Sequence, residues 1–205
     1  MYYGERFNGL SHLIGSVLAV TGLVTLVSMA ALQGDPWKIV SFSLYGATLV
    51  ILYLVSTLYH SVKGRTKAIL QKCDHSAIYL LIAGSYTPYC LVTLRGAWGW
   101  TLFGLSWGLA LFGIIQELTL GRRTRLLSMI LYVLMGWLVV IAIGPLVERL
   151  ATGGLVWLTL GGVLYSVGIY WFINDEKIRH GHGIWHLFVL GGSICQFLSV
   201  LLYVA

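Results

Sequence analysis

Long apolar runs separated by short polar segments make up most of this chain. A helix needs about 20 apolar residues, each rising ~1.5 Å, to cross a hydrocarbon core of ~30 Å. Seven runs meet that length: Leu10–Leu32, Ile39–His60, His75–Leu94, Trp98–Gln116, Leu126–Val147, Gly153–Ile173 and Ile184–Ala205. The runs show no period of two, and open sheet edges cannot lie in lipid, so the pattern predicts helices. We expect an all-α membrane protein in which residues 1–205 form one seven-helix transmembrane domain.

The first apolar run could instead belong to a secretion signal, with Ser28-Met29-Ala30 resembling a cleavage site. However, the run from Leu10 to Leu32 is too long for the apolar part of a signal peptide. A signal peptide also opens with a positively charged region, and Glu5 and Arg6 before this run provide only a weak one. We therefore expect the first helix to be retained.

Composition supports a lipid environment. Hydrophobic residues make up 58% of the chain and charged residues only 10%, against about 25% charged residues in soluble domains. The net charge of +6 is concentrated in a few loops, which indicates contact with anionic lipid headgroups rather than nucleic acid. The three cysteines, Cys73, Cys90 and Cys195, cannot all pair with one another, and two of them lie in apolar runs, so no disulfide framework is expected.

Basic residues set the orientation, because cytoplasmic loops carry the excess of Lys and Arg. The side that holds the N-terminus has ten of the 13: Arg6, Lys63, Arg65, Lys67, Lys72, Arg122, Arg123, Arg125, Lys177 and Arg179. The other side has three, Lys38, Arg95 and Arg149. We expect a cytoplasmic N-terminus and, with an odd number of spans, an extracytoplasmic C-terminus. This orientation is opposite to that of G-protein-coupled receptors, and the last span lacks the lysine of rhodopsin-type pigments.

All six histidines fall at the cytoplasmic ends of the predicted spans: His12, His60, His75, His180, His182 and His186. Helical residues four apart share a face, so His182 and His186 project from one side of the last span. Ser56 and His60 do the same on the second span. Two imidazoles one turn apart and a third from another helix form the ligand set of a catalytic zinc site, with the fourth position left for water. We predict Zn²⁺ bound by His60, His182 and His186.

Other interpretations of these polar residues remain open. A single interfacial histidine often contacts headgroups or backbone, which is the alternative for His75 and His180. Cys73 adjoins Asp74 and is a competing metal ligand. The last span has no glutamate after its first histidine, unlike zincin metalloproteases, so a general base has to come from another helix. Asp74, at the start of the third span, is the candidate.

Several stretches resemble a known family: Ser56-Thr57-Leu58-Tyr59-His60, Asp74-His75-Ser76-Ala77-Ile78-Tyr79, Ala83-Gly84-Ser85-Tyr86-Thr87-Pro88 and His182-Gly183-Ile184-Trp185-His186-Leu187-Phe188-Val189. Glu5, Asn8 and His12 match an opening Glu-x-x-Asn-x-x-x-His pattern. In order and spacing the chain resembles the bacterial hemolysin III family. That family is the prokaryotic branch of the progestin and adipoQ receptors, which include the adiponectin receptors.

The resemblance implies a seven-helix bundle in the bacterial plasma membrane. It also implies zinc held by the same three histidines, with Asp74 and Ser56 close to the metal-bound water. It assigns no role to Glu5, Asn8, His12, His75 or His180. One departure is Gln196, where many bacterial relatives carry a histidine.

By similarity to related membrane hydrolases, ceramidases among them, the favoured function is cleavage of a lipid amide or ester at the cytoplasmic side. Asp74 would be the general base and Ser56 would orient the water. Membrane lipids, with a lipid substrate in the bundle, are the expected partners. The alternative is a non-enzymatic receptor or regulator of membrane lipid homeostasis, with a structural zinc that clamps the helices. A haemolytic pore or transporter ranks last, because the outer halves of the predicted spans hold no ionisable residue.

Two further patterns concern helix geometry. Gly104-Leu105-Ser106-Trp107-Gly108 matches a serine nucleophile elbow, but no strand-turn-helix context surrounds it. The same residues form a GxxxG pattern, which favours a helix-packing face. Pro88 and Pro145 lie within apolar runs and are expected to kink their helices.

Overall fold

The computed structural model describes residues 1, 4–120 and 125–205, and in this part of the chain it is helical, with no strand. The helices are α1 (Arg6–Gln33), α2 (Pro36–Tyr59), α3 (Gly64–Pro88), α4 (Ala97–Leu120), α5 (Arg125–Gly136), α6 (Ile143–Arg149), α7 (Thr152–Ile173) and α8 (Gly181–Tyr203). A π-helical turn, η1 (Tyr89–Thr93), continues α3, and a 3₁₀ segment, η3 (Leu138–Ala142), joins α5 to α6. Together they provide seven helical segments long and apolar enough to span a membrane. The prediction of an all-α protein with seven spans is confirmed.

The connection between α1 and α2 shows how local sequence sets the helix ends. Gly34 has φ of 67°, a left-handed conformation that glycine adopts readily, and its N–H bonds back to the end of α1. Asp35 then caps α2, because its side chain accepts hydrogen bonds from the backbone N–H groups of Trp37 and Lys38. Pro36 follows at the first helical position, where its missing N–H is not needed.

The spans differ from their predicted limits mainly at α3 and at the fifth span. Helix α3 begins at Gly64, eleven residues before the predicted start at His75. Its first turns are polar, so a hydropathy pattern finds only the part of the helix that lies in lipid. Regular α-helix ends at Pro88, and Pro145 lies in the first turn of α6. Both prolines therefore lie next to irregular segments of their spans.

The break in the fifth span leaves backbone groups that need partners inside the membrane. Tyr86 of α3 supplies them: its hydroxyl donates to the carbonyl of Gly136 (2.9 Å) and accepts from the N–H of Val139 (3.0 Å). Irregular backbone is tolerated at this depth when neighbouring helices satisfy it. One tyrosine side chain thus stabilises the change from α5 to η3.

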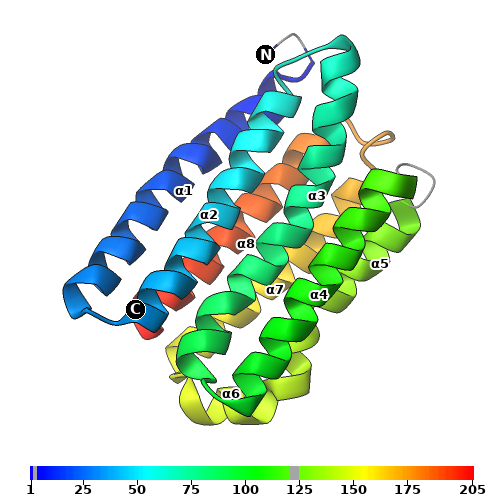
Figure 1. Cartoon of the computed structure of the whole chain (residues 1–205). Helices are drawn as coiled ribbons and strands as arrows, with labels where there is room; N and C mark the ends of the chain where they lie inside the picture. Colours follow the sequence, from blue (N-terminus) through cyan, green and yellow to red (C-terminus); the bar gives the residue numbers. More distant parts are fainter. Residues whose placement is uncertain (2–3, 121–124) are drawn as a thin grey trace.

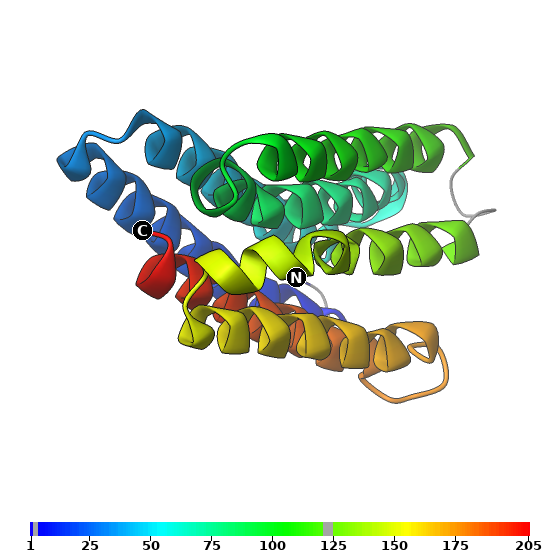
Figure 2. The same ribbon diagram turned by 90° about the horizontal axis from the view of Figure 1, so that it is seen from below.

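The helices form one bundle with the N-terminus and the C-terminus at opposite ends (Figure 1). Helix α1 packs against α2 and α8, α2 packs against α3, α3 against α4, and α7 against α8. Seen from below, the segment α5–η3–α6 lies between α4 and α7 (Figure 2). The connections α2–α3 and α7–α8 share the end of the N-terminus, so the two segments that carry the predicted histidine ligands begin or end there.

The GxxxG pattern on α4 does not pack against another helix of the chain. A Cβ atom added at Gly104 or Gly108 would meet no described atom within 4 Å, so both glycines face outward, and no described helix of this chain covers the predicted packing face. Gly113, on another side of α4, instead lies directly against the ring of Tyr79. Ser106 is buried and its hydroxyl donates to the carbonyl of Phe103.

We expect a reporter enzyme fused after Ala205 to be active only outside the cytoplasm. The prediction depends on the excess of basic residues at the end of the N-terminus; of these, Arg122 and Arg123 lie outside the described residues. A matched fusion after Lys177, in the α7–α8 connection, should show the opposite behaviour. The measurement is the activity of a periplasm-dependent reporter in intact cells. Cytoplasmic activity of the fusion after Ala205 would contradict the orientation.

Candidate metal centre

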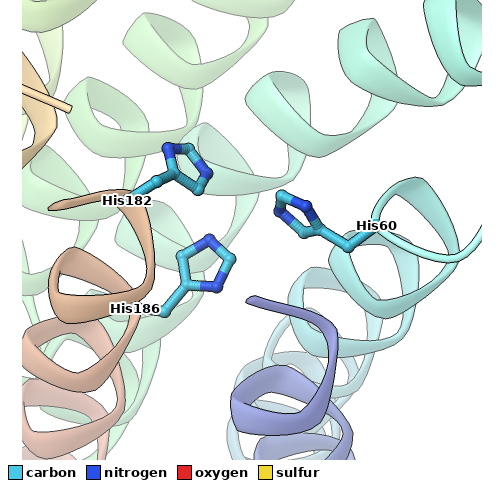
Figure 3. Close-up of side chains that lie close together, drawn as sticks. All are labelled: His60, His182 and His186. Carbon is cyan, nitrogen blue, oxygen red and sulfur yellow. The ribbon is translucent and has the colours of Figure 1, made fainter. Parts of the chain in front are cut away.

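The three predicted histidine ligands converge at one end of the bundle (Figure 3). His60 caps the C-terminal end of α2, while His182 and His186 lie one turn apart at the start of α8. One ligand nitrogen from each ring lies within 4.8 Å of the other two. His60 and His186 are 2% and 0% exposed, whereas His182 is half-buried.

Each imidazole is oriented by a hydrogen bond at its Nδ1 atom. His60 Nδ1 lies 2.6 Å from Glu5 Oε2, and His182 Nδ1 lies 2.9 Å from Asp175 Oδ2. His186 Nδ1 lies 3.2 Å from the backbone carbonyl oxygen of Asn8. These partners are acceptors, so they favour a proton on each Nδ1 and leave the lone pair on Nε2. This is the arrangement that outer partners impose on metal-binding histidines.

The Nε2 atoms of His60, His182 and His186 are all buried and have no hydrogen-bond partner in the protein. A buried polar atom without a partner typically costs about 1–3 kcal/mol. Three such atoms that face one another on neutral imidazoles are suited to a shared cation. Imidazole nitrogens are good ligands for zinc, and three of them leave a fourth position open. The residues present therefore fit a zinc ion.

Glu5 links the first turn of α1 to this cluster. Its carboxylate accepts from Lys67 Nζ at 2.5 Å and from Asn8 Nδ2 at 2.9 Å, in addition to the contact with His60. Burial raises the pKa of Glu5, but the hydrogen bonds from His60, Lys67 and Asn8 outweigh it and hold the pKa well below its usual range. Glu5 is therefore ionised at neutral pH and is the outer partner of His60.

The sequence alone did not indicate that these residues are partners of the histidines. Glu5 and Asn8 belong to the opening pattern, and the structure now explains both, through the Glu5 carboxylate and the Asn8 backbone carbonyl. Asp175 lies in the α7–α8 connection, seven residues before His182. Nothing in the sequence distinguishes it from other loop carboxylates, because its role depends on how that loop folds back over α8.

Asp74 and Ser56, the predicted catalytic residues, lie beside the histidine cluster. Asp74 of α3 is 6% exposed and interacts electrostatically with His60 and His182. Ser56 of α2 is one turn before His60 and is 1% exposed. The Ser56 hydroxyl lies close to the Asp74 carboxylate, but its oxygen has no hydrogen-bond partner in the protein. A carboxylate and a hydroxyl thus border the cluster, and their catalytic roles stay predictions.

His75 and His180 lie apart from the cluster, and Cys73 is exposed. The ring of His75 bonds to Glu117 Oε1 of α4 at 2.9 Å, and the other oxygen of Glu117 accepts from Ser128 of α5 at 3.0 Å. This contact joins three helices, so His75 has a protein partner. His180 precedes α8 with a positive φ of 62° and packs edge-on against Phe7. Within the described residues, the three predicted histidines are the one cluster whose ligand atoms lie close enough together to hold a metal ion.

A cavity of about 240 Å³ begins beside the cluster and continues through the bundle. His12, Asp74 and Trp185 line its cytoplasmic end, and Leu94 and Leu146 line its far end. Asp74 and Leu94 are twenty residues apart on the span of α3 and η1, which corresponds to ~30 Å along a helix axis. Most of the other lining side chains are apolar, so a long hydrocarbon chain suits the cavity.

Gln196 contributes to the wall of this cavity. Its side-chain amide donates to the carbonyl of Leu158 at 3.2 Å and so joins α8 to α7. It lies ten residues beyond His186, ~15 Å along α8. Gln196 therefore affects the cavity rather than the metal ligands.

The fold and the site define a multi-pass plasma-membrane protein with a polar histidine cluster at one end of an apolar cavity. The chain belongs to the family described as haemolysin-III related, whose model matches residues 2–197. It is 46% identical to Hemolysin-3 of Bacillus cereus over 201 residues, which cover 98% of this chain and 91% of that protein. It is 48% identical to the Hemolysin-3 homolog of Bacillus subtilis (strain 168) over 200 residues, which cover 97% and 93% of the two chains.

A more distant relative comes from animals. The human monocyte to macrophage differentiation factor is 27% identical over 192 residues, which cover 91% of this chain and 79% of that protein. The family resemblance inferred from the motifs is confirmed. The names of these relatives refer to haemolysis and cell differentiation and do not specify a reaction.

We expect Glu5→Gln to weaken zinc binding by roughly 10–100-fold, the usual effect of losing an outer partner of a metal ligand. The change removes the charge that favours a proton on His60 Nδ1 and orients the ring. Zinc affinity would be measured by competition with a chelator. Glu176→Gln, an exposed carboxylate in the α7–α8 connection, is the matched control. Equal affinities for the two variants would exclude Glu5 as an outer partner.

Proposed function

We propose that this protein is a zinc-dependent hydrolase that cleaves an amide or ester bond of a membrane lipid at the cytoplasmic end of the bundle. One observation carries the proposal. The unpartnered Nε2 atoms of His60, His182 and His186 meet beside the carboxylate of Asp74, where a long apolar cavity begins. A three-histidine set with an adjacent carboxylate is typical of hydrolytic zinc sites rather than purely structural ones.

The three histidines would hold the ion, which when bound polarises a carbonyl and makes water a better nucleophile. Asp74 would accept the proton of the attacking water on a carboxylate oxygen and pass it to the leaving group. Ser56 would orient that water through its hydroxyl. The burial of both residues keeps bulk water from competing for these positions.

The cavity would hold the acyl chain of the substrate. Its apolar lining extends away from Asp74 through much of the bundle, so the bond to be cleaved would lie at the cytoplasmic end with the chain toward the opposite leaflet. The test is hydrolysis of ceramides, N-acyl amides and acyl esters by purified protein loaded with zinc, with release of free fatty acid as the readout. We expect release from at least one class of long-chain lipid.

A second candidate is a non-enzymatic regulator of membrane lipid state with a structural zinc. Its support is that Glu5, Asn8 and Asp175 tie α1, α2, α8 and the α7–α8 connection to the histidines, so an ion there would also fasten helices together. A pore is less suited to this bundle. Along the described cavity wall, His12 and Asp74 at the cytoplasmic end supply the only histidine or acidic side chains, and no Lys or Arg contributes.

A further inference from the structure

The side chain of Gln196 carries a hydrogen-bond acceptor that the hydrolytic proposal does not use. Its amide nitrogen donates to the carbonyl oxygen of Leu158, but its amide oxygen, Oε1, makes no hydrogen bond to any described residue. Exchanging the two amide atoms would place Oε1 against another carbonyl oxygen, so the contact with Leu158 fixes which atom is the nitrogen. Gln196 therefore retains one unpartnered acceptor.

This acceptor is accessible from the cavity. Gln196 is 7% exposed and lies on the cavity wall. The ring nitrogens of His12 and the hydroxyl oxygens of Tyr45 and Tyr89 also lack a partner, but these atoms are closed off from any accessible surface. Gln196 Oε1 is not closed off in this way, so a polar group of a bound molecule can reach it.

Two other polar side chains of the cavity wall differ from Gln196, because their hydroxyl groups are already bonded. The Tyr165 hydroxyl lies 2.8 Å from Ser193 Oγ, and the Ser85 hydroxyl donates to the carbonyl oxygen of Ile82 at 2.8 Å. Most of the remaining lining is apolar. An acceptor that loses water without gaining a donor typically costs about 1–3 kcal/mol. A chain that fills the cavity would incur this cost at Gln196 unless the chain itself supplies a donor.

We propose that Gln196 makes the cavity selective for acyl chains that carry a hydroxyl group near their middle. A secondary alcohol offers one O–H donor, which Oε1 accepts, whereas a saturated hydrocarbon chain offers none. Gln196 lies ~15 Å beyond His186 in a cavity that extends for ~30 Å, so the hydroxyl group would lie about halfway along the chain. The inference rests on the proposed lipid cavity and adds the chemistry of the chain. It does not depend on turnover or on the head group.

The experiment measures binding of octadecanoic acid, and of a series of octadecanoic acids with one hydroxyl group at successive chain positions, to the whole chain in lipid nanodiscs. Each affinity is corrected for partition into empty nanodiscs. Wild-type protein should bind the best-placed hydroxy acid about tenfold more tightly than octadecanoic acid, as expected for one additional hydrogen bond. The affinity should fall as the hydroxyl group moves toward either end of the chain.

Gln196→Met keeps the length of the side chain and removes both polar atoms. The variant should bind the best-placed hydroxy acid about tenfold more weakly than the wild type and should bind octadecanoic acid with unchanged affinity. Because methionine adapts to irregular spaces, the wall of the cavity should remain filled.

The matched control is Ser85→Ala. Ser85 also lines the cavity, and it lies eleven residues beyond Asp74 on α3, a depth similar to that of Gln196. Its hydroxyl is bonded within its own helix, so the variant should keep the preference for the hydroxy acid. If Gln196→Met does not fold, the series of positions measured on the wild type still decides the question.

The outcomes separate this inference from the proposed hydrolase. Equal affinity for all the acids in the wild type, as expected if water alone bonds to Oε1, would overturn the role of Gln196 whether or not lipid is hydrolysed. An unchanged preference in Gln196→Met would overturn it as well. Selective binding of one hydroxy acid without fatty-acid release from any lipid would support the role of Gln196 and count against the hydrolase. If no acid binds, the lipid cavity and this inference would both be wrong.

Discussion

Asp74→Asn should lower the rate of lipid hydrolysis by ~10²–10⁴-fold, the usual contribution of a general base. The change keeps the size of the side chain and most of its hydrogen bonding but removes the basic oxygen. Zinc should stay bound, because Asp74 borders the three histidines and is not one of them. The measurement is fatty-acid release by the wild type and the variant at equal zinc content.

Two variants sharpen this comparison. Ser56→Ala should have a smaller effect than Asp74→Asn, because a hydroxyl can orient water but does not take its proton. Glu117→Gln changes another buried carboxylate, which pairs with His75 away from the cluster. It should reduce stability and leave turnover per zinc-loaded molecule unchanged. If the wild type is no faster than Asp74→Asn on any lipid of the panel, the regulator with a structural zinc becomes the better proposal.

His186→Ala should reduce the zinc content from about one ion per chain to nearly none, because two protein ligands rarely hold zinc tightly. Zinc that binds only the folded protein stabilises it by about 4 kcal/mol at a concentration 1,000 times Kd. The wild type should therefore unfold at a lower temperature when a chelator is added. The variant should unfold at a low temperature with and without the chelator. Metal analysis and thermal unfolding of the purified proteins provide the two measurements.

The matched control is His180→Ala, two residues before His182 in sequence and outside the cluster in the structure. This variant should keep both the zinc and the response to the chelator. Full zinc occupancy in His186→Ala would mean that the ligand set is wrong. Cys73, His75 and His180 would then be the next residues to change.

Much of the architecture could be predicted because it depends on local properties of the chain. Hydropathy reports how long each apolar run is, and the distribution of Lys and Arg indicates which ends lie in the cytoplasm. The candidate ligands could also be predicted from the sequence. A spacing of four places His182 and His186 on one helix face, and His60 is expected at a similar depth in the membrane. The structure brings these three rings together.

Some helix limits and one helix face differ from what the sequence predicted. The polar first turns of α3 hid its start at Gly64, because a polar helix outside the lipid has no hydropathy signal. The glycines of the GxxxG pattern, Gly104 and Gly108, face outward. The pattern identifies a helix face of small residues but does not specify which surface packs against it. The regular part of α5 ends at Gly136, where Tyr86 from another helix satisfies the irregular backbone.

The sequence by itself determined the class of protein, the seven spans and three residues suited to a metal. Only the tertiary structure decided which of the six histidines meet and what surrounds them. His12 joins the cluster by stacking on His186, while His75, next to Asp74 in sequence, turns to Glu117 instead. Adjacent helical residues point about 100° apart, so the packing of neighbouring helices selects which one faces the site. For the same reason the roles of Glu5 and Asp175 depend on segments distant in the chain coming together around one site.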